Sequence, residues 1–358
     1  MRPALPRPAR FAALAAVAAL ALTACSSGGS DDSGATAGAT TPSAGETAAT
    51  AQAFPVTLKN TFGDTTVPAK PERVATVAWA NQDVPISLGV VPVGFAKQAY
   101  GDDNGDGVLP WTFDALSKLG ATGDKLPKLF DETAGIDFEG VNDTQPDVVL
   151  AAYSGLSKDD WTQLSAIAPT VSFPRVAWAT TWRETALLDG EAIGLKTQAQ
   201  AKVDEVDKVI ADAVAAHPDI AGKTFAYTWI DKADKSKFWV YTQDDARVEY
   251  VEDLGLKLAP SVTALSSDKK FAGQLSAENA DKLADADILV TYGDDSTLAW
   301  LQKDPLLSKI PAVARGSVVV VPDNSSLAAS TSGPTVLSIP WGIDDYTDLF
   351  EAAAKKVQ

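Results

Sequence analysis

The sequence Lys196–His217, KTQAQAKVDEVDKVIADAVAAH, predicts one long amphipathic helix. Its apolar residues recur at three- and four-residue steps and therefore share one helical face: Val203, Val206, Ile210, Ala213 and Val214. Thr197 followed by Gln200 fits a capping box at the start of this helix. The pair His217-Pro218 ends it, because proline disfavours helical geometry at the residue before it.

Blocks of similar size, in which short apolar strands alternate with helical segments, flank this helix on both sides. Such alternation indicates mainly parallel sheets. The sequence therefore predicts an α/β protein with two Rossmann-like lobes joined by one long α-helix. The expected N-terminal lobe covers residues 54–195, the connecting helix 196–217 and the C-terminal lobe 218–358. A crossover helix within one larger domain is the alternative that this pattern leaves open.

Local patterns predict the individual elements of each lobe. In the first lobe we expect a hairpin at 54–67, strands at 73–79, 90–95, 147–151 and 170–173, and helices at 82–88 and 158–166. In the second we expect strands at 221–230, 238–241 and 316–321, a helix at 247–254 and a polar loop at 325–332. A closing helical region at 334–356 should break at Pro340-Trp341.

The composition excludes several classes of function. The formal net charge of −17 argues against nucleic acid, which binds Lys/Arg patches. A single Cys rules out an internal disulfide and a Cys-based metal site. With a single His, the chain cannot form a multi-His zinc site, and it has only one residue that could serve as the base of a Ser-His-Asp triad. Nine Trp and seven Tyr supply flat aromatic surface that can also form hydrogen bonds.

The N-terminus has the pattern of a secretory signal peptide, expected at residues 1–24. Three Arg precede the apolar stretch Phe11–Leu22, which is too short to span a bilayer. Leu22-Thr23-Ala24-Cys25 resembles the bacterial lipoprotein box, which implies cleavage before Cys25 and its lipidation. An ordinary signal peptide with a chance Cys is the alternative. Residues 25–53, rich in Ser, Gly, Thr and Ala, predict a flexible tether on the extracytoplasmic face of the cell membrane.

Five short motifs of the first lobe resemble, in order and spacing, those of iron–siderophore substrate-binding proteins of ABC importers. They are Asn60 with Phe62-Gly63, then 67–74 (VPAKPERV), 88–94 (LGVVPVG), 145–150 (QPDVVL) and 164–171 (LSAIAPTV). In the second lobe the segments 275–283 and 286–290 continue the resemblance, which covers about residues 54–357. The resemblance implies the same two-lobe fold with a helical connector, a monomer, no enzymatic activity and no cofactor.

The resemblance also implies contact residues for a membrane permease. In this family one acidic residue on each lobe meets an Arg of the permease, and Glu139 and Glu278 occupy the matching positions. An ordinary exposed helix Glu is the alternative for Glu139.

Ligand candidates come from aromatic and Arg residues near the lobe junction, where clefts form. An Arg can pair with anionic ligand oxygens, and Trp faces can pack on a ligand. The candidates are Trp79, Tyr100, Trp111, Arg175, Trp178, Trp182, Trp229, Tyr241 and Arg247. Each Trp at the junction has a structural role as its alternative.

The loop between Tyr100 and Trp111 is a weaker candidate for a calcium site. Asp102, Asn104 and Asp106 have the alternating oxygen spacing of a calcium loop. The twelfth position is Phe113, which has no carboxylate, so a solvated acidic loop is the alternative.

These observations predict a lipid-anchored receptor that binds a ferric siderophore between its lobes and delivers it to an ABC importer permease. A ferric chelate brings its own iron ligands, so the protein needs aromatic faces and Arg donors but no metal ligands. The alternatives are the same fold carrying cobalamin or haem, a calcium-dependent extracellular interaction module, and an extracytoplasmic enzyme. The siderophore class does not follow from the sequence.

Overall fold

The computed structural model describes residues 52–265 and 270–357. The predicted signal peptide, Cys25 and the tether up to residue 51 lie outside the described residues. Within the described part of the chain, no helix is both long and apolar enough to cross a membrane.

The first lobe is built on a five-stranded parallel sheet in the order β5-β4-β3-β6-β7. Its strands are β3 (Val74–Thr76), β4 (Gly94–Ala96), β5 (Lys128–Phe130), β6 (Val148–Ala151) and β7 (Thr170–Ser172). The connecting elements are α1 (Asp83–Ser87), α2 (Pro110–Lys118), η1 (Gly123–Lys125), α3 (Phe138–Asp143), α4 (Lys158–Ile167) and α5 (Trp182–Ala192). All four residues of β6 are fully buried, as expected for a strand covered on both faces.

An antiparallel hairpin of β1 (Val56–Asn60) and β2 (Gly63–Val67) precedes this sheet. Val56 and Leu58 on one strand and Val67 on the other are buried, so the hairpin presents one apolar face to the lobe. The hairpin was predicted from the alternation of apolar and polar residues, and the pairing of Val56 with Val67 confirms it.

The second lobe contains a mixed sheet in the order β11-β9-β8-β12-β13, with β10 paired to β8. Strands β10, β8, β12 and β13 are parallel, whereas β9 and β11 join antiparallel. The strands are β8 (Thr224–Trp229), β9 (Lys237–Tyr241), β10 (Lys257–Leu258), β11 (Ala272–Ser276), β12 (Ile288–Gly293) and β13 (Val318–Pro322). The helices are η2 (Pro218–Ile220), α7 (Ala246–Asp253), α8 (Pro260–Leu265), η3 (Ala277–Leu283), α9 (Thr297–Lys303), η4 (Leu307–Lys309), α10 (Pro311–Arg315), α11 (Ser326–Ser332) and α12 (Ser338–Ala354).

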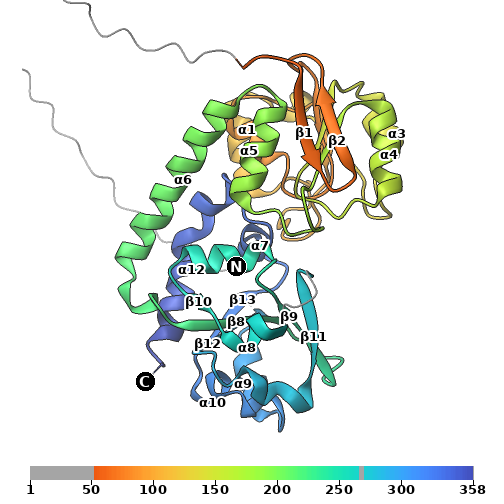
Figure 1. Cartoon of the computed structure of the whole chain (residues 1–358). Coiled ribbons are helices and arrows are strands. Elements are labelled where there is room, and N and C mark those ends of the chain that lie inside the picture. The colour runs from red at the N-terminus through yellow and green to blue at the C-terminus, as the bar shows by residue number, and fades with distance from the viewer. Residues whose placement is uncertain (1–51, 266–269, 358) are drawn as a thin grey trace, which may run out of the picture. The chain divides into compact units, whose positions relative to one another are not determined.

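The connecting helix α6 runs from Lys196 to Ala216 and links the two lobes (Figure 1). Its buried face consists of Ala199, Val203, Val206, Ile210 and Ala213, close to the face predicted from the periodicity. The predicted capping box is wrong, because the cap residue is Leu195 and Gln200 donates instead to Asp204. The first amide of the helix, that of Lys196, donates to Gln52 Oε1 at 3.3 Å, so a residue far away in sequence supplies the cap.

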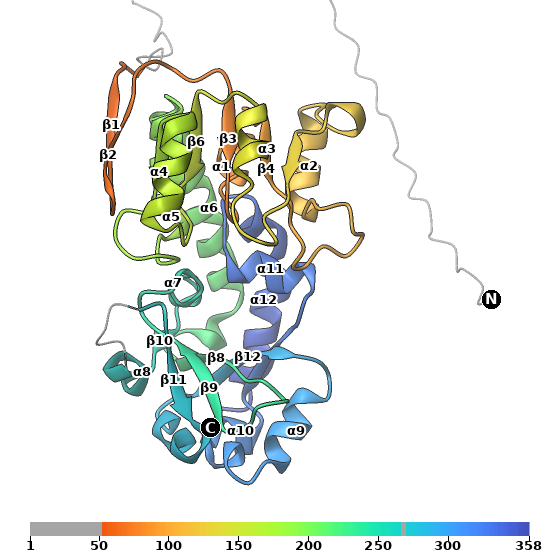
Figure 2. The same ribbon diagram turned by 90° about the vertical axis from the view of Figure 1, so that its right-hand side faces the viewer.

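A second connection between the lobes comes from α11 and α12 (Figure 2). The predicted polar loop at 325–332 is wrong, because Ser326–Ser332 is the helix α11. Its hydroxyl groups bond within the helix, where Ser330 and Thr331 donate to the carbonyl of Leu327. The predicted break at Pro340 is also absent, because Pro340 lies in the first turn of α12, where its missing N–H leaves no bond unmade.

The C-terminal segment bonds directly to the first lobe. Ser326 Oγ donates to the Gly101 carbonyl at 2.8 Å and to Asp103 at 2.7 Å. Thr335 Oγ1 donates to Asp83 Oδ2 at 2.7 Å. The two lobes are therefore held together along α6 and through the segment around α11, and also where Trp182 and Arg183 of α5 donate to Asp253 of α7.

Asp83 is the buried centre of this second connection. Its side chain is fully buried and accepts hydrogen bonds from Trp111 Nε1 at 2.7 Å, Thr112 Oγ1 at 2.6 Å and Thr335 Oγ1. Burial raises the pKa of Asp83 to about 6, although these hydrogen bonds lower it.

Asp83→Asn should remove a pH-dependent part of the stability. Because the folded pKa lies above its ordinary value of 3.8, the protonated carboxyl adds stability that is fully present below pH 4 and lost as the pH rises through about 6. The free energy of unfolding of the wild type should therefore gain up to about 3 kcal/mol over the variant between pH 7 and pH 4. Urea unfolding at a series of pH values measures this difference.

The exposed carboxyl of Asp114 on α2 provides the matched control, as Asp114→Asn. A difference between wild type and Asp83→Asn that stays constant over the pH range would contradict the role given to Asp83.

Candidate ligand-binding site

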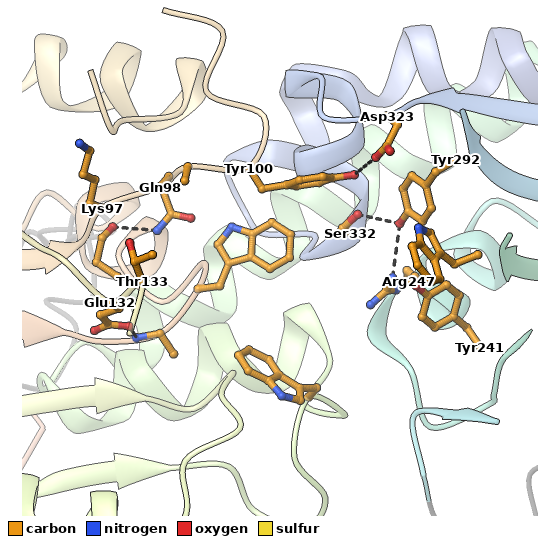
Figure 3. A pocket seen from close by; sticks show the side chains of 16 residues that line it. Lys97, Gln98, Tyr100, Glu132, Thr133, Tyr241, Arg247, Tyr292, Asp323 and Ser332 are labelled. Carbon is orange, nitrogen blue, oxygen red and sulfur yellow. Dashed lines mark hydrogen bonds between the residues drawn. The ribbon is translucent and has the colours of Figure 1, made fainter. Parts of the chain in front are cut away.

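A cavity of about 570 Å³ lies between the two lobes, within the size range of small-molecule sites (Figure 3). The first lobe lines it with Ala78, Trp79, Ala96, Lys97, Gln98, Ala99, Tyr100, Glu132, Thr133 and Trp178. The second lobe contributes Trp229, Tyr241, Arg247, Tyr292, Asp323 and Ser332. No sulfur-containing side chain and no His are among these lining residues.

Parallel strands position most of this lining at their carboxyl ends, the usual place for ligands in open α/β sheets. In the first lobe Trp79 follows β3, Lys97 to Tyr100 follow β4, and Glu132 follows β5. In the second lobe Trp229 ends β8, and Asp323 directly follows β13. The two sheets therefore direct their carboxyl ends toward one cavity.

The part of the first lobe that lines the cavity contains residues with left-handed backbone conformation. Ala78, Ala80 and Trp178 have φ angles of 59°, 73° and 62°, values that non-glycine residues rarely adopt. Each such residue costs of the order of 1–3 kcal/mol, so neighbouring contacts must hold it in place. The buried Asn81 does so for the first turn: its Nδ2 donates to the carbonyls of Val77 and Tyr153, and its Oδ1 accepts the Tyr153 N–H.

Aromatic rings form the faces of the cavity. The rings of Trp79 and Tyr100 meet edge to face with centroids 6.0 Å apart. Trp178 packs edge-on against Tyr153 at 5.5 Å. Trp79 and Trp178 are only half-buried, so part of each indole remains available to a ligand.

Arg247 is the buried cation of the second-lobe wall. Its Nε donates to Asp245 Oδ1 at 2.7 Å, and its side chain is 12% exposed. The guanidinium lies over the Tyr241 ring, 3.8 Å from the centroid, and donates to the Tyr292 hydroxyl at 3.4 Å. Burial by itself lowers the pKa of Arg247, but Asp245 and the surrounding phenols raise this pKa by more. The pKa of Arg247 therefore lies well above its ordinary value, and the guanidinium stays charged.

Glu132 supplies a carboxyl group to the opposite wall. Its Oε2 accepts the Ala78 N–H at 2.9 Å, which helps hold the left-handed turn, whereas its buried Oε1 has no partner among the described residues. Burial raises the pKa of Glu132 to about 7, and the nearby Asp137 adds to this effect. The free oxygen can accept a hydrogen bond from a ligand.

Tyr100 and Asp323 meet across the cavity from different lobes. The Tyr100 hydroxyl donates to Asp323 Oδ1 at 3.0 Å. Next to this pair, the Gly101 N–H donates to Asn324 Oδ1 at 3.3 Å.

Six of the nine predicted ligand candidates line the cavity: Trp79, Tyr100, Trp178, Trp229, Tyr241 and Arg247. The structure places Trp111, Trp182 and Arg175 outside it. Trp111 and Trp182 are core residues, 4% and 2% exposed, with their indole N–H groups bonded to Asp83 and Asp253. Arg175 forms a two-point ion pair with Glu184 at 2.6 and 2.8 Å.

Several lining residues were missed from the sequence. Tyr292 and Asp323 lie at the carboxyl ends of strongly apolar strands, ILVTYG and VVVVP, and the strand-end rule could have found them. Glu132 follows β5, a three-residue strand with one buried side chain, too short for a clear pattern.

The acidic loop near Tyr100 closes on itself. Asp102 accepts the amides of Asn104, Gly105 and Gly107, and Asp106 accepts the amide of Val108. These internal hydrogen bonds are those of an ordinary Asx-type turn. Calcium binding by this loop stays an untested prediction.

The described residues contain one group of three His, Cys, Asp or Glu side chains whose ligand atoms lie within 4.8 Å of one another: His217, Asp348 and Glu351. None of them lines the cavity, and Glu351 already bonds to His217 at 2.9 Å and to Lys355 at 2.7 Å.

The predicted permease contacts occupy corresponding places on the two lobes. Glu139 is the second residue of α3 and Glu278 the second residue of η3, and both are exposed. Neither carboxylate forms an ion pair or hydrogen bond with another described residue.

Comparisons with known proteins place this geometry in context. A family model described as "Periplasmic binding protein" matches residues 74–325. The Bacillus subtilis "Iron(3+)-hydroxamate-binding protein YxeB" is 26% identical over 273 residues, which cover 74% of this chain and 77% of that protein. The "Probable siderophore-binding lipoprotein YfiY" of the same organism is 24% identical over 237 residues, 66% of this chain and 67% of that protein.

A similar solved structure is that of Streptococcus pneumoniae PiaA in complex with ferrichrome. Its sequence is 43% identical, the TM-score is 0.81, and the match covers 84% of this chain and 99% of that one.

Arg247→Leu should destabilise the protein by roughly 3–5 kcal/mol, because it leaves the Asp245 carboxylate buried without its cation. Adding Asp245→Asn should restore more than half of the loss, since Asn can still accept the α7 amide that Asp245 caps. Urea unfolding of both variants tests this coupling, and a double variant no more stable than the single one would contradict it.

Proposed function

The chain belongs to the periplasmic binding protein family, and we propose that it is the extracytoplasmic receptor that binds a ferric siderophore between its lobes and delivers it to an ABC importer. The observation that carries this proposal is the cavity itself. It combines half-buried Trp faces with one buried Arg, and its lining has no His or Cys. Such a lining suits an iron complex whose ligands are its own.

The charges of the lining favour a hydroxamate siderophore. The cavity lining includes the cations Lys97 and Arg247 and the carboxyl groups of Glu132 and Asp323, and Arg247 is already paired with Asp245, so the lining has no excess of positive charge. Three singly charged hydroxamates neutralise ferric iron, whereas three catecholates leave the complex strongly anionic. A cavity without excess positive charge therefore favours the hydroxamate complex. Two similar proteins support this choice: YxeB is named as an iron–hydroxamate-binding protein, and the PiaA structure contains ferrichrome.

Each wall then has a distinct task in binding. Trp79 and Trp178 pack on the apolar parts of the siderophore. Arg247 and the phenols beside it donate hydrogen bonds to the chelating oxygens, which keep a partial negative charge. Glu132 Oε1 accepts from an N–H group of the siderophore.

The membrane anchor and the docking contacts complete the proposal. Cys25, the only Cys of the chain, is the lipidated residue, and residues 25–53 tether the receptor. Glu139 and Glu278 meet Arg residues of the permease. Exposed acids of this kind set the orientation and rate of association more than its affinity.

Titration of the purified full-length protein with ferric trihydroxamate should quench its tryptophan fluorescence to saturation, because Trp79, Trp178 and Trp229 line the cavity. Ferric catecholate and citrate complexes should bind at least about tenfold more weakly, a difference of roughly 1.4 kcal/mol. The gallium complex of the same trihydroxamate controls for optical quenching by iron. Saturable binding of haem or cobalamin instead, with no response to trihydroxamate, would overturn the proposed cargo.

The double variant Glu139→Gln/Glu278→Gln should bind the siderophore as the wild type does, because neither residue lines the cavity. Uptake of radioactive ferric siderophore by cells should fall by about tenfold or more, since the permease loses a charged contact on each lobe. Asp114→Asn/Asp345→Asn, which neutralises two other exposed acids, is the charge-matched control. Normal uptake by the Glu variant would contradict the docking role.

A further inference from the structure

A group of metal-ligating side chains lies outside the cavity, where the end of α6 meets α12. It consists of His217, Asp348 and Glu351, whose ligand atoms all lie within 4.8 Å of one another. His217 is the residue at which α6 ends, whereas the two acids are three residues apart on α12 and therefore share one face of that helix. One imidazole and two carboxylates from two helices form a mixed donor set, which a patch of surface acids alone does not provide.

The packing of α6 against α12 fixes the backbone on both sides of this group (Figure 1). Ala213, one turn before His217, belongs to the same buried apolar cluster as Phe350. Phe350 directly precedes Glu351, so the core sets the separation between the two helices at this point. The side chains of His217 and Glu351 are themselves largely covered, with 16% and 27% exposed.

The distances within the group suit a tetrahedral metal ion. In such a site, zinc–ligand bonds of about 2.0–2.1 Å place neighbouring ligand atoms roughly 3.3–3.4 Å apart. His217 Nδ1 and Glu351 Oε2 are 2.9 Å apart. Asp348 is exposed, and its carboxylate bonds to no other described residue, so it can turn toward this pair without breaking a contact.

The two oxygens of Glu351 have different partners. Lys355 Nζ forms an ion pair with Oε1 at 2.7 Å, which leaves Oε2 to His217. A partner on the distant oxygen orients a ligating carboxylate. A neutral imidazole with its proton on Nε2 has a free lone pair on Nδ1, so a metal ion can take the place of the hydrogen bond between Nδ1 and Oε2.

The charges around the group favour a cation. Its two carboxylates and the nearby Asp219 surround a single cation, Lys355. The bond to Glu351 is the main cause that raises the pKa of Lys355, and the charges of Asp219 and Asp348 raise it further. The end of α6 adds partial negative charge, because the last carbonyl groups of a helix have no partner within the helix.

We propose that His217, Asp348 and Glu351 bind a divalent transition-metal ion, for which zinc is the best match, and that water fills the fourth position. Mixed imidazole and carboxylate ligation suits zinc, whereas calcium and magnesium prefer oxygen ligands alone.

The ion connects the two segments that join the lobes. α6 is the connecting helix, and α12 continues the C-terminal segment that bonds to the first lobe through Thr335. An ion that binds only the folded protein stabilises it, so zinc at 100 times its dissociation constant should raise the ratio of folded to unfolded protein about 100-fold. The site lies outside the cavity and is independent of the proposed cargo.

Calorimetric titration of the full-length, chelator-treated protein with zinc chloride tests the inference. Zinc should bind to one site per chain, and calcium and magnesium chloride should bind at least about tenfold more weakly, because neither ion favours the imidazole. X-ray absorption at the zinc edge should show a single imidazole nitrogen at about 2.0–2.1 Å among oxygen ligands.

Two ligand variants and one control locate the site. His217→Asn and Asp348→Asn should each weaken zinc binding by at least about 10- to 100-fold, the loss found even for groups that only support a metal ligand. Asp348→Asn should also leave the urea unfolding of the zinc-free protein unchanged, because the Asp348 carboxylate bonds to no other described residue. Asp204→Asn, which removes an exposed acid elsewhere on α6, should bind zinc as the wild type does.

Each outcome decides for or against the site. Loss of zinc binding in both ligand variants, with binding retained in Asp204→Asn, would establish it. Zinc binding that is absent, or equal in the wild type and both ligand variants, would overturn it. Calcium binding as tight as that of zinc, without any effect of His217→Asn, would also overturn it, because the group would then act as an ordinary acidic surface.

Discussion

The arrangement of the two lobes depends on one buried carboxyl group that accepts hydrogen bonds from both the first lobe and the C-terminal segment. Asp83, fully buried in the first lobe, accepts hydrogen bonds from Trp111 and Thr112 of α2 and from Thr335 of the C-terminal segment. An uncompensated buried carboxyl would be costly, so these donors must all be in place when the protein folds. Because Thr335 leads into α12 and follows α11, the same contact fixes Ser332 and Tyr292 beside the cavity. The cavity therefore has its shape because the C-terminal segment returns to the first lobe.

The cavity itself combines rigid and adjustable parts. Its first-lobe wall contains left-handed residues that Asn81 and Glu132 hold in place, which gives the indole of Trp79 a fixed direction. Its second-lobe wall has a buried ion pair, Asp245 with Arg247, and a bonded row of hydroxyl groups. Between them, Tyr100 and Asp323 can exchange one hydrogen bond for contact with a ligand. Such a combination sets fixed aromatic and charged contacts beside one contact that a ligand can replace.

The features that could be predicted from the sequence are those that depend on local periodicity and on the order of motifs. The apolar face of α6, the hairpin and the two-lobe α/β architecture follow from spacings of two and of three to four residues. Helix α11 could not be found in this way, because its Ser and Thr residues are typical of loops until their hydroxyl groups bond within the helix. The cap of α6 comes from Gln52, which no local pattern connects to Lys196. For the site, residue type alone could not separate Trp79 and Trp178, which line the cavity, from Trp111 and Trp182, whose indole N–H groups donate to the carboxyl groups of Asp83 and Asp253.

The sulfur-free lining has a consequence for oxidative damage. Iron that is reduced in the presence of peroxide generates reactive oxidants close to where it is bound, and Met and Cys are the side chains most readily converted to sulfoxide, sulfenic acid and higher oxides. Beyond Cys25 the chain has neither residue, since its only Met is Met1. A protein that repeatedly holds iron at its centre therefore contains, throughout its two lobes, no thioether or thiol for that chemistry to consume.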